Sequence, residues 1–175
     1  MVDFLHLNFP RFWASLLPVG SAILLTILVN LPVSLTGGLF PAPMLALPAI
    51  YFWALVRPDL MSPFAVLFIG LLEDFLSGGP PGLWASGFLA AYALADRQRE
   101  ILAGLSGAIA LFGFAAAMLL ASATAYILTW IVYLRWPALA PLLLASVITV
   151  MFYPLIALPL GWMHRRVVGA MRGEA

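Results

Sequence analysis

Long apolar runs follow one another along this chain, and only short polar segments separate them. No polar stretch is longer than about a dozen residues, whereas a soluble domain needs roughly 50. Hydrophobic residues make up 65% of the chain and charged residues 9%, against roughly 45–50% and about 25% in soluble domains. The sequence therefore predicts a single integral membrane domain over residues 1–175, all α-helical, with spans at 13–35, 39–56, 60–77, 83–95, 101–134 and 139–163.

Two of these runs depart from the usual length of a membrane span, which is roughly 17–25 residues. The run at 83–95 is short and the run at 101–134 is long. The fourth helix is therefore expected to be tilted, to span a thin stretch of bilayer with few residues, or to continue into the charged segment DRQRE at 96–100. The first run exceeds a signal-peptide core of about 7–15 residues, so it is predicted to be an uncleaved span.

The arginines indicate how often the chain crosses the membrane. All 8 basic residues are Arg, and cytoplasmic segments carry an excess of Arg and Lys. With six spans and a cytoplasmic N-terminus, Arg135 is the one arginine outside. The expected fold is a six-helix bundle with both termini in the cytoplasm, and the arginines that favour this topology are Arg57, Arg97, Arg99, Arg165 and Arg166.

Charge and composition argue against several classes of function. A net charge of +1 provides no basic field for nucleic acid. The chain has no cysteine, which excludes disulfides, thiolate metal sites and a Cys nucleophile. Paired acids catalyse only where they converge on a substrate, and the two acids discussed next are adjacent on one helix. We expect no catalytic, cofactor-binding or metal-binding residue, and no enzyme.

The segment GLLEDFLSGGPPGLWA at 70–85 places two adjacent acids inside an apolar run. Adjacent helical residues point about 100° apart, so Glu73 and Asp74 cannot face the same neighbour. Gly70 lies one turn before Asp74 on the same face, where a glycine lets another helix approach. We expect Asp74 to face the bundle and Glu73 to face the outer headgroups or a partner.

A tight turn follows these acids, and we interpret it as closed by a carboxylate. Glycines permit positive φ angles and prolines end a helix. Asp74 can accept the backbone N–H groups that such a turn frees, and those groups need partners at membrane depth. The residues predicted to build this turn or an interaction there are Glu73, Asp74, Gly70, Gly78, Pro80, Pro81 and Gly82.

Small residues recur at every fourth position of the run at 101–134, and they are Gly113, Ala117, Ala121 and Ala125. Gly87, Ala91 and Ala95 do the same in the preceding run. Small residues at this spacing let helix backbones approach closely in lipid. Packing within the bundle is the favoured interpretation, and a partner-binding face is the alternative.

Three stretches of the chain resemble the MreD family of bacterial rod-shape-determining membrane proteins. They are FPAPMLALPAIYFWALVRPDL at 40–60, GLLEDFLSGGPPGLWA at 70–85 and YPLIALPLGWMHRR at 153–166. The second is similar to that family's pattern of Gly, Asp, an apolar pair and a Gly/Pro turn. Glu73 and the doubled Pro80-Pro81 depart from the pattern, which leaves open the role of Glu73 and the conformation of the turn.

The resemblance implies a non-enzymatic subunit of the cell-elongation complex in the bacterial inner membrane. Such a subunit binds the membrane helix of MreC and so connects MreB filaments with the RodA/penicillin-binding-protein pair that builds peptidoglycan. The resemblance also implies a bundle similar to the substrate-binding subunits of energy-coupling-factor transporters. A vitamin-like small-molecule binding subunit of a transporter is therefore the alternative, although fold alone does not determine function.

Overall fold

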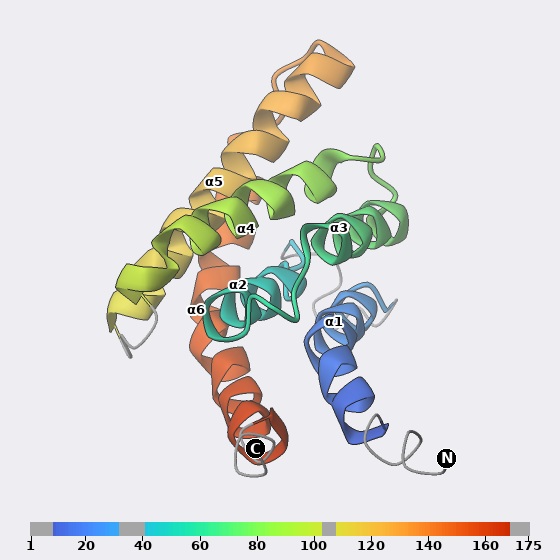
Figure 1. Cartoon of the computed structure of the whole chain (residues 1–175). Helices are drawn as coiled ribbons and strands as arrows, with labels where there is room; N and C mark the ends of the chain where they lie inside the picture. Colours follow the sequence, from blue (N-terminus) through green and yellow to red (C-terminus); the bar gives the residue numbers. More distant parts are fainter. Residues whose placement is uncertain (1–8, 32–40, 103–107, 169–175) are drawn as a thin grey trace.

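Helices are the only regular elements in the part of the chain that the structure describes. The computed structural model describes residues 9–31, 41–102 and 108–168, with side chains at 16–31, 41–100 and 109–166. The predicted all-helical fold is confirmed for these residues. The helices, drawn in Figure 1, are α1 (Phe9–Val29), α2 (Ala46–Val56), α3 (Pro63–Ser77), α4 (Leu83–Leu102), α5 (Ala108–Tyr133), α6 (Leu139–Met163) and a π-helix, η1 (His164–Val168).

The predicted boundaries agree with the structure at α6, and at α4 the structure shows one of the predicted alternatives. Helix α6 covers the predicted run at 139–163 residue for residue. Helix α4 continues through 96–100 to Leu102, so the fourth helix extends into DRQRE and ends beyond the predicted residue 95. The helix continues because Arg, Gln and Glu favour helix, and Arg99 pairs with Asp96 one turn earlier at 3.7 Å.

Helices α1 and α3 also begin at different residues from those predicted. Helix α1 begins at Phe9 instead of 13 and ends at Val29, and 32–35 of the predicted run lie outside the described residues. Helix α3 begins at Pro63 instead of 60. It begins there because the Ser62 hydroxyl accepts a hydrogen bond from the Ala65 N–H at 3.2 Å, and proline suits the first helical position.

Helix α2 is much shorter than the predicted span at 39–56. Residues 41–44 are not helical, and they include Pro41 and Pro43, which lack a backbone N–H. Thr149 of α6 accepts the hydrogen bond of the Met44 N–H at 2.9 Å. Of the 11 residues of α2, 8 are buried, and α2 contacts α1, α4, α5 and α6. It forms the centre of the bundle.

Rings from three helices meet at this centre. Phe114 of α5 stacks on Tyr153 of α6 with ring centroids 4.5 Å apart, and Tyr51 of α2 packs edge-on against both, at 5.3 and 5.8 Å. The three side chains are buried. Aromatic pairs at these separations stabilise a core beyond their buried area, so this cluster joins α2 to the long helices α5 and α6.

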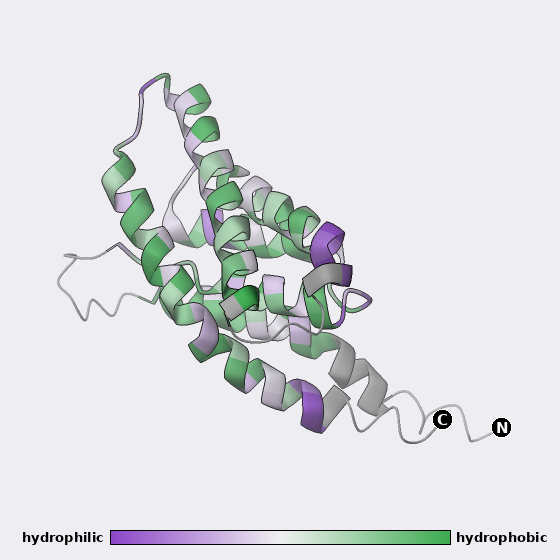
Figure 2. Ribbon diagram, turned by 90° about the vertical axis from the view of Figure 1, so that its left-hand side faces the viewer, coloured by the Kyte–Doolittle hydropathy of each residue, from purple (hydrophilic) through white to green (hydrophobic). Residues whose placement is uncertain are grey.

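Two helices in the described part are long and apolar enough to cross a bilayer, at Ile109–Tyr133 and Leu139–Arg166. Helices α2 and α3 have 11 and 15 residues, fewer than the roughly 17–25 of a full span. Many large apolar side chains on α5 and α6 are exposed, and Figure 2 shows hydrophobic colours over most of the helical surface. Such surfaces are typical of contact with lipid. The six crossings stay a prediction.

Candidate functional site

The carboxylate of Asp74, on α3, binds the first N–H groups of α4. Its Oδ1 accepts a hydrogen bond from the Trp84 N–H at 2.7 Å, and its Oδ2 accepts from Gly82 at 2.8 Å and Ala85 at 3.3 Å. These N–H groups have no partner inside their own helix, and negative charge is favoured at a helix N-terminus. The bonds agree with the expected role of Asp74, whose side chain is buried.

The backbone carbonyl of the same residue closes the end of α3. It accepts hydrogen bonds from the Gly78 N–H and from the Gly79 N–H, the latter at 3.1 Å, and from the Ser77 hydroxyl at 3.3 Å. Gly78 has a φ of 70° and Gly82 a φ of 97°, a region that favours glycine. Asp74 therefore closes one helix with its backbone and the next with its side chain.

No backbone N–H from residue 78 to 85 is left without an acceptor. Pro80 and Pro81 have none to donate, and the Leu83 N–H donates to the Pro80 carbonyl at 3.3 Å. The remaining N–H groups are those bound by Asp74. An unsatisfied backbone N–H costs several kcal/mol in a hydrocarbon environment, and the described residues of this turn leave none. We call residues 74–85 the Asp74 clamp.

Gly70 brings the backbones of α3 and α4 together beside the clamp. A Cβ atom at this position would lie 2.3 Å from the Ala85 Cα and 2.8 Å from the Ala85 nitrogen. No larger residue fits without moving one of the two backbones. The expectation that Gly70 permits a close helix approach next to Asp74 agrees with this geometry.

Glu73 does not face the outer headgroups or a partner, so that expectation is wrong. Its side chain is 4% exposed, and its Oε1 accepts a hydrogen bond from Asn30 Nδ2 of α1 at 3.1 Å. Helix α3 contacts both α1 and α4, so the 100° between adjacent side chains directs the two acids at two different helices. The second oxygen, Oε2, has no hydrogen-bond partner among the described residues.

The small-residue face of α5 packs inside the bundle. Ala117, Ala121 and Ala125 are buried, while Gly113 is only partly buried. A Cβ at Gly87 of α4 would lie 3.0 Å from the Ala121 carbonyl oxygen. The favoured interpretation, packing against the chain's own α4, agrees with these contacts. The three alanines are therefore covered by the chain's own helices, whereas Gly113 stays partly open.

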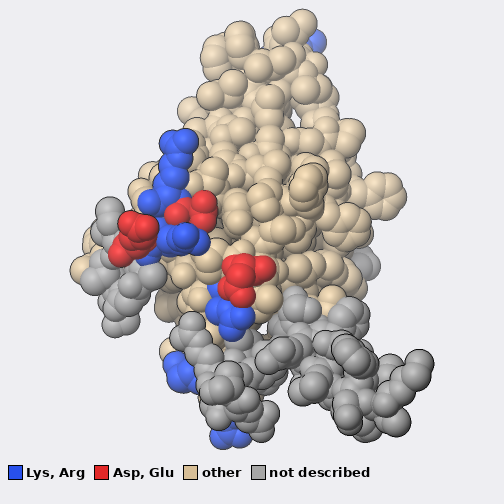
Figure 3. Space-filling view, viewed as in Figure 1, with Lys and Arg blue, Asp and Glu red and all other residues tan. Residues whose placement is uncertain are grey.

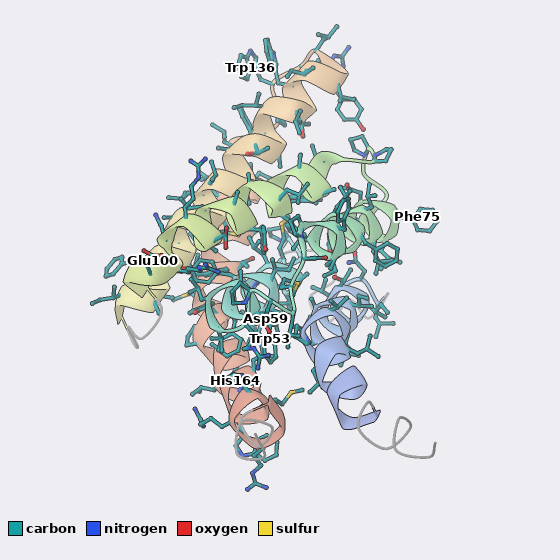
Figure 4. The ribbon with its side chains drawn as sticks, in the orientation of Figure 1. Trp53, Asp59, Phe75, Glu100, Trp136 and His164 are labelled. Atoms are coloured by element: carbon teal, nitrogen blue, oxygen red, sulfur yellow. The ribbon has the colours of Figure 1, made fainter. Side chains whose placement is uncertain are left out.

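An outward face of α3 carries three phenylalanines that the sequence reasoning missed. Phe64 and Phe75 are each 83% exposed, Phe68 is 59% exposed and Leu71 is 40% exposed. Their positions, i, i+4, i+7 and i+11, lie on one side of a helix. Figure 4 shows Phe75 pointing away from the bundle. We call these four residues the phenylalanine face.

The arginines that favoured the predicted topology lie away from the tip of the molecule where α5 connects to α6. Figure 4 places Glu100 at mid-height, Asp59 and His164 below it, and Trp136 at the upper tip. Figure 3 shows the charged side chains of this face at the left of the view and toward its lower end, apart from one basic group near the upper tip. Arg57 Nη2 pairs with Asp59 Oδ2 at 2.7 Å, and this hydrogen bond raises the pKa of Arg57. Arg97, Arg99, Arg165 and Arg166 are exposed.

Several polar contacts between helices were also missed. Trp53 Nε1 donates to the Ser21 hydroxyl at 3.0 Å, and the hydroxyls of Ser122 and Ser146 lie 2.9 Å apart. The first joins α1 to α2 and the second joins α5 to α6. The available signal was an isolated polar residue within an apolar run, because such residues pair with one another in membrane bundles.

Among the described residues, no group of three or more His, Cys, Asp or Glu side chains could hold a metal ion. The chain matches no protein-family model, and no curated protein or solved structure matches it. The function is therefore inferred from the clamp, from the exposed faces and from the sequence resemblance.

Proposed function

We propose that this chain is a non-enzymatic, multi-pass subunit of the cell-elongation complex in the bacterial inner membrane. Both termini lie in the cytoplasm, and the chain binds the membrane helix of MreC. Through MreC it connects MreB filaments with the RodA/penicillin-binding-protein pair, and so supports peptidoglycan synthesis and cell shape. We choose the cell-elongation complex because residues 70–85 resemble the MreD pattern.

The phenylalanine face on a rigid α3 is the observation that carries the proposal. Aromatic side chains, Phe included, are enriched at protein interfaces relative to the rest of the surface. On its other sides α3 is held by the Asp74 clamp, by the Gly70 contact and by the bond from Asn30 to Glu73. Because α3 is already held in place, it loses little conformational entropy when a partner binds. A rigid surface gains affinity in this way.

Recovery of MreC with the purified chain tests the proposal. We expect the tagged chain to retain its own organism's MreC at near-stoichiometric ratio in mild detergent, measured by quantitative mass spectrometry. Replacing Phe68 and Phe75 by Ala together should lower this recovery at least about tenfold, because truncation of a hot-spot residue costs about 2 kcal/mol or more and about 1.4 kcal/mol is a factor of ten.

Phe112 of α5 provides a matched control, because it is 75% exposed and lies outside the phenylalanine face. Phe112→Ala should leave the recovery of MreC unchanged. The proposal fails if the wild-type chain retains no MreC. An equal loss with Phe112→Ala and with the double variant would instead show that α3 has no special role.

A small-molecule binding subunit of a transporter is the second candidate. The buried Glu73 favours it, because Oε2 has no hydrogen-bond partner among the described residues and could accept a hydrogen bond from a polar ligand. Recovery of a small molecule in place of MreC, lost in Glu73→Gln, would support this candidate over the first.

A further inference from the structure

Three aromatic rings stack on one another at the tip of the molecule where α5 connects to α6. The ring centroids of Trp130 and Trp136 lie 4.9 Å apart, and those of Tyr126 and Trp136 lie 6.0 Å apart. Trp136, which Figure 4 labels at the upper tip, is 69% exposed, and Trp130 is 37% exposed. Because both indoles are exposed, the stack faces whatever surrounds the tip.

The side chains of this tip suit neither water nor hydrocarbon alone. Leu134 is 80% exposed and Val132 is 56% exposed, and exposed apolar surface is unfavourable in water. Arg135 is exposed as well, and a charge is costly in hydrocarbon. The headgroup layer of a bilayer accepts both kinds of side chain. Trp and Tyr are enriched in that layer because their rings have an apolar body and a polar end.

The length of α5 places the stack at the edge of the hydrocarbon. The apolar helix from Ile109 to Tyr133 has 25 residues, so it is roughly 37 Å long at a rise of about 1.5 Å per residue. The hydrocarbon of a bilayer is about 30 Å thick. Residues 109–111 are all apolar, so the helix enters the hydrocarbon at its start. It then leaves the hydrocarbon about 20 residues later, near Trp130.

The turn of the Asp74 clamp lies at the same level as this stack. A small hollow between the turn and α5 is lined by residues 80–83 of the turn and by Leu128 and Val132 of α5. Trp130 lies midway between these two residues of α5 in the sequence. The turn is therefore next to the part of α5 where the hydrocarbon ends.

We infer that the aromatic tip, formed by Tyr126, Trp130 and Trp136, is an interfacial anchor that binds the headgroup layer of one leaflet and sets the depth of the bundle. Arg135 lies among the phosphates of the same layer. The inference goes beyond the proposed function, because it requires that α5 crosses a bilayer but requires no particular partner. It also gives the Asp74 clamp a depth, at the boundary between hydrocarbon and headgroups.

Spin labels at single cysteines test this inference, and the chain has no cysteine of its own. Ile131→Cys labels the tip, Leu76→Cys the end of α3 beside the turn, and Leu119→Cys the middle of α5; all three side chains are exposed. Each labelled full-length chain is reconstituted in phosphatidylcholine vesicles. The accessibility of the label to oxygen and to a water-soluble nickel complex, measured by electron paramagnetic resonance, gives its depth.

The labels at 131 and 76 are expected to share one depth, within the headgroup layer of about 5–7 Å. The label at 119 should lie roughly 15–18 Å deeper, near the bilayer centre, because 12 residues separate it from 131. A label at 131 as accessible to the nickel complex as one at the exposed Glu100 would place the tip in water and overturn the inference. Depths at 131 and 76 that differ by more than about 7 Å would also overturn it.

Two matched double variants show whether the rings hold the tip. Trp130 and Trp136 are replaced together by Tyr, which keeps a ring with a polar end, or together by Leu, which has none. The label at 131 should keep its depth with Tyr and move at least about 3 Å toward the bilayer centre with Leu, the rise of about two residues. Equal depths in the two variants would show that the rings do not anchor the tip.

The label at 119 separates a failure of this inference from a failure of its premise. If that label is as accessible to the nickel complex as the one at Glu100, α5 does not cross the bilayer, and both the anchor and the membrane location are wrong. Loss of MreC recovery with all three depths as expected would contradict the proposed function alone and support the anchor.

Discussion

Asp74→Ala is expected to lower the free energy of unfolding by about 3–5 kcal/mol, because a hydrogen bond to a charged group contributes about 1.5–3 kcal/mol. The substitution removes the acceptor of the Gly82, Trp84 and Ala85 N–H groups. These N–H groups are then left without an acceptor, because little water can take the place of the carboxylate in a membrane protein. Denaturant unfolding in mild detergent, followed by tryptophan fluorescence, measures the change.

Two further variants show whether the loss of stability in Asp74→Ala comes from the loss of the carboxylate. Asp74→Asn keeps the shape but turns an N–H₂ group toward the backbone donors, so we expect most of the same loss. Glu73→Ala removes a single bond from Asn30 and should cost about 1–2 kcal/mol, the penalty of a lost buried hydrogen bond. Equal losses for Asp74→Ala and Glu73→Ala would show that the clamp does not stabilise the turn.

Gly70→Ala is the second substitution with a large expected effect. The new Cβ would lie 2.3 Å from the Ala85 Cα, and because the obstacle is backbone it cannot rotate away. We expect a loss of about 3 kcal/mol, at the upper end of the usual cost of overpacking. The melting temperature in detergent should fall accordingly, and MreC recovery should fall with it because α3 shifts.

Gly20→Ala is the matched control for this substitution. Both glycines lie within helices, and a Cβ at Gly20 meets no atom within 4 Å. Alanine favours helix over glycine by about 1 kcal/mol, so Gly20→Ala should be neutral or slightly stabilising. If Gly70→Ala is equally well tolerated, α3 and α4 do not pack as closely as the structure places them.

The sequence predicts the Asp74 clamp well because its determinants are local. Asp74, the glycines and the prolines lie within a dozen residues, and each has one conformational role that its chemistry dictates. Gly70 is predictable for the same reason, since one helical turn relates it to Asp74. The all-helical fold follows from the long apolar runs.

The orientation of Glu73 and the length of α2 depend on distant parts of the chain and were predicted wrongly. Glu73 is buried because Asn30, 43 residues away, offers a hydrogen bond. Helix α2 begins at Ala46, later in the sequence than predicted. The Met44 N–H before it donates its hydrogen bond to Thr149, which is 105 residues away. Neither partner can be read from local pattern, because polar residues in lipid pair across helices.

The proposed function depends on which helix faces the bundle leaves exposed. The three alanines of the small-residue face are covered by the chain's own helices, so the proposal places the partner on another face. The phenylalanine face is the exposed face directly behind the clamp. In this account the clamp does not bind the partner; it holds the helix that does.

Site-specific photo-crosslinking tests this account most directly. A photoreactive phenylalanine analogue replaces Phe68 in one strain and Phe112 in another, and the adducts formed in living cells are identified by mass spectrometry. The account expects an adduct with MreC from position 68 and none from position 112. An MreC adduct from position 112 alone, or no MreC adduct from either position while the chain is present at normal level, would contradict it.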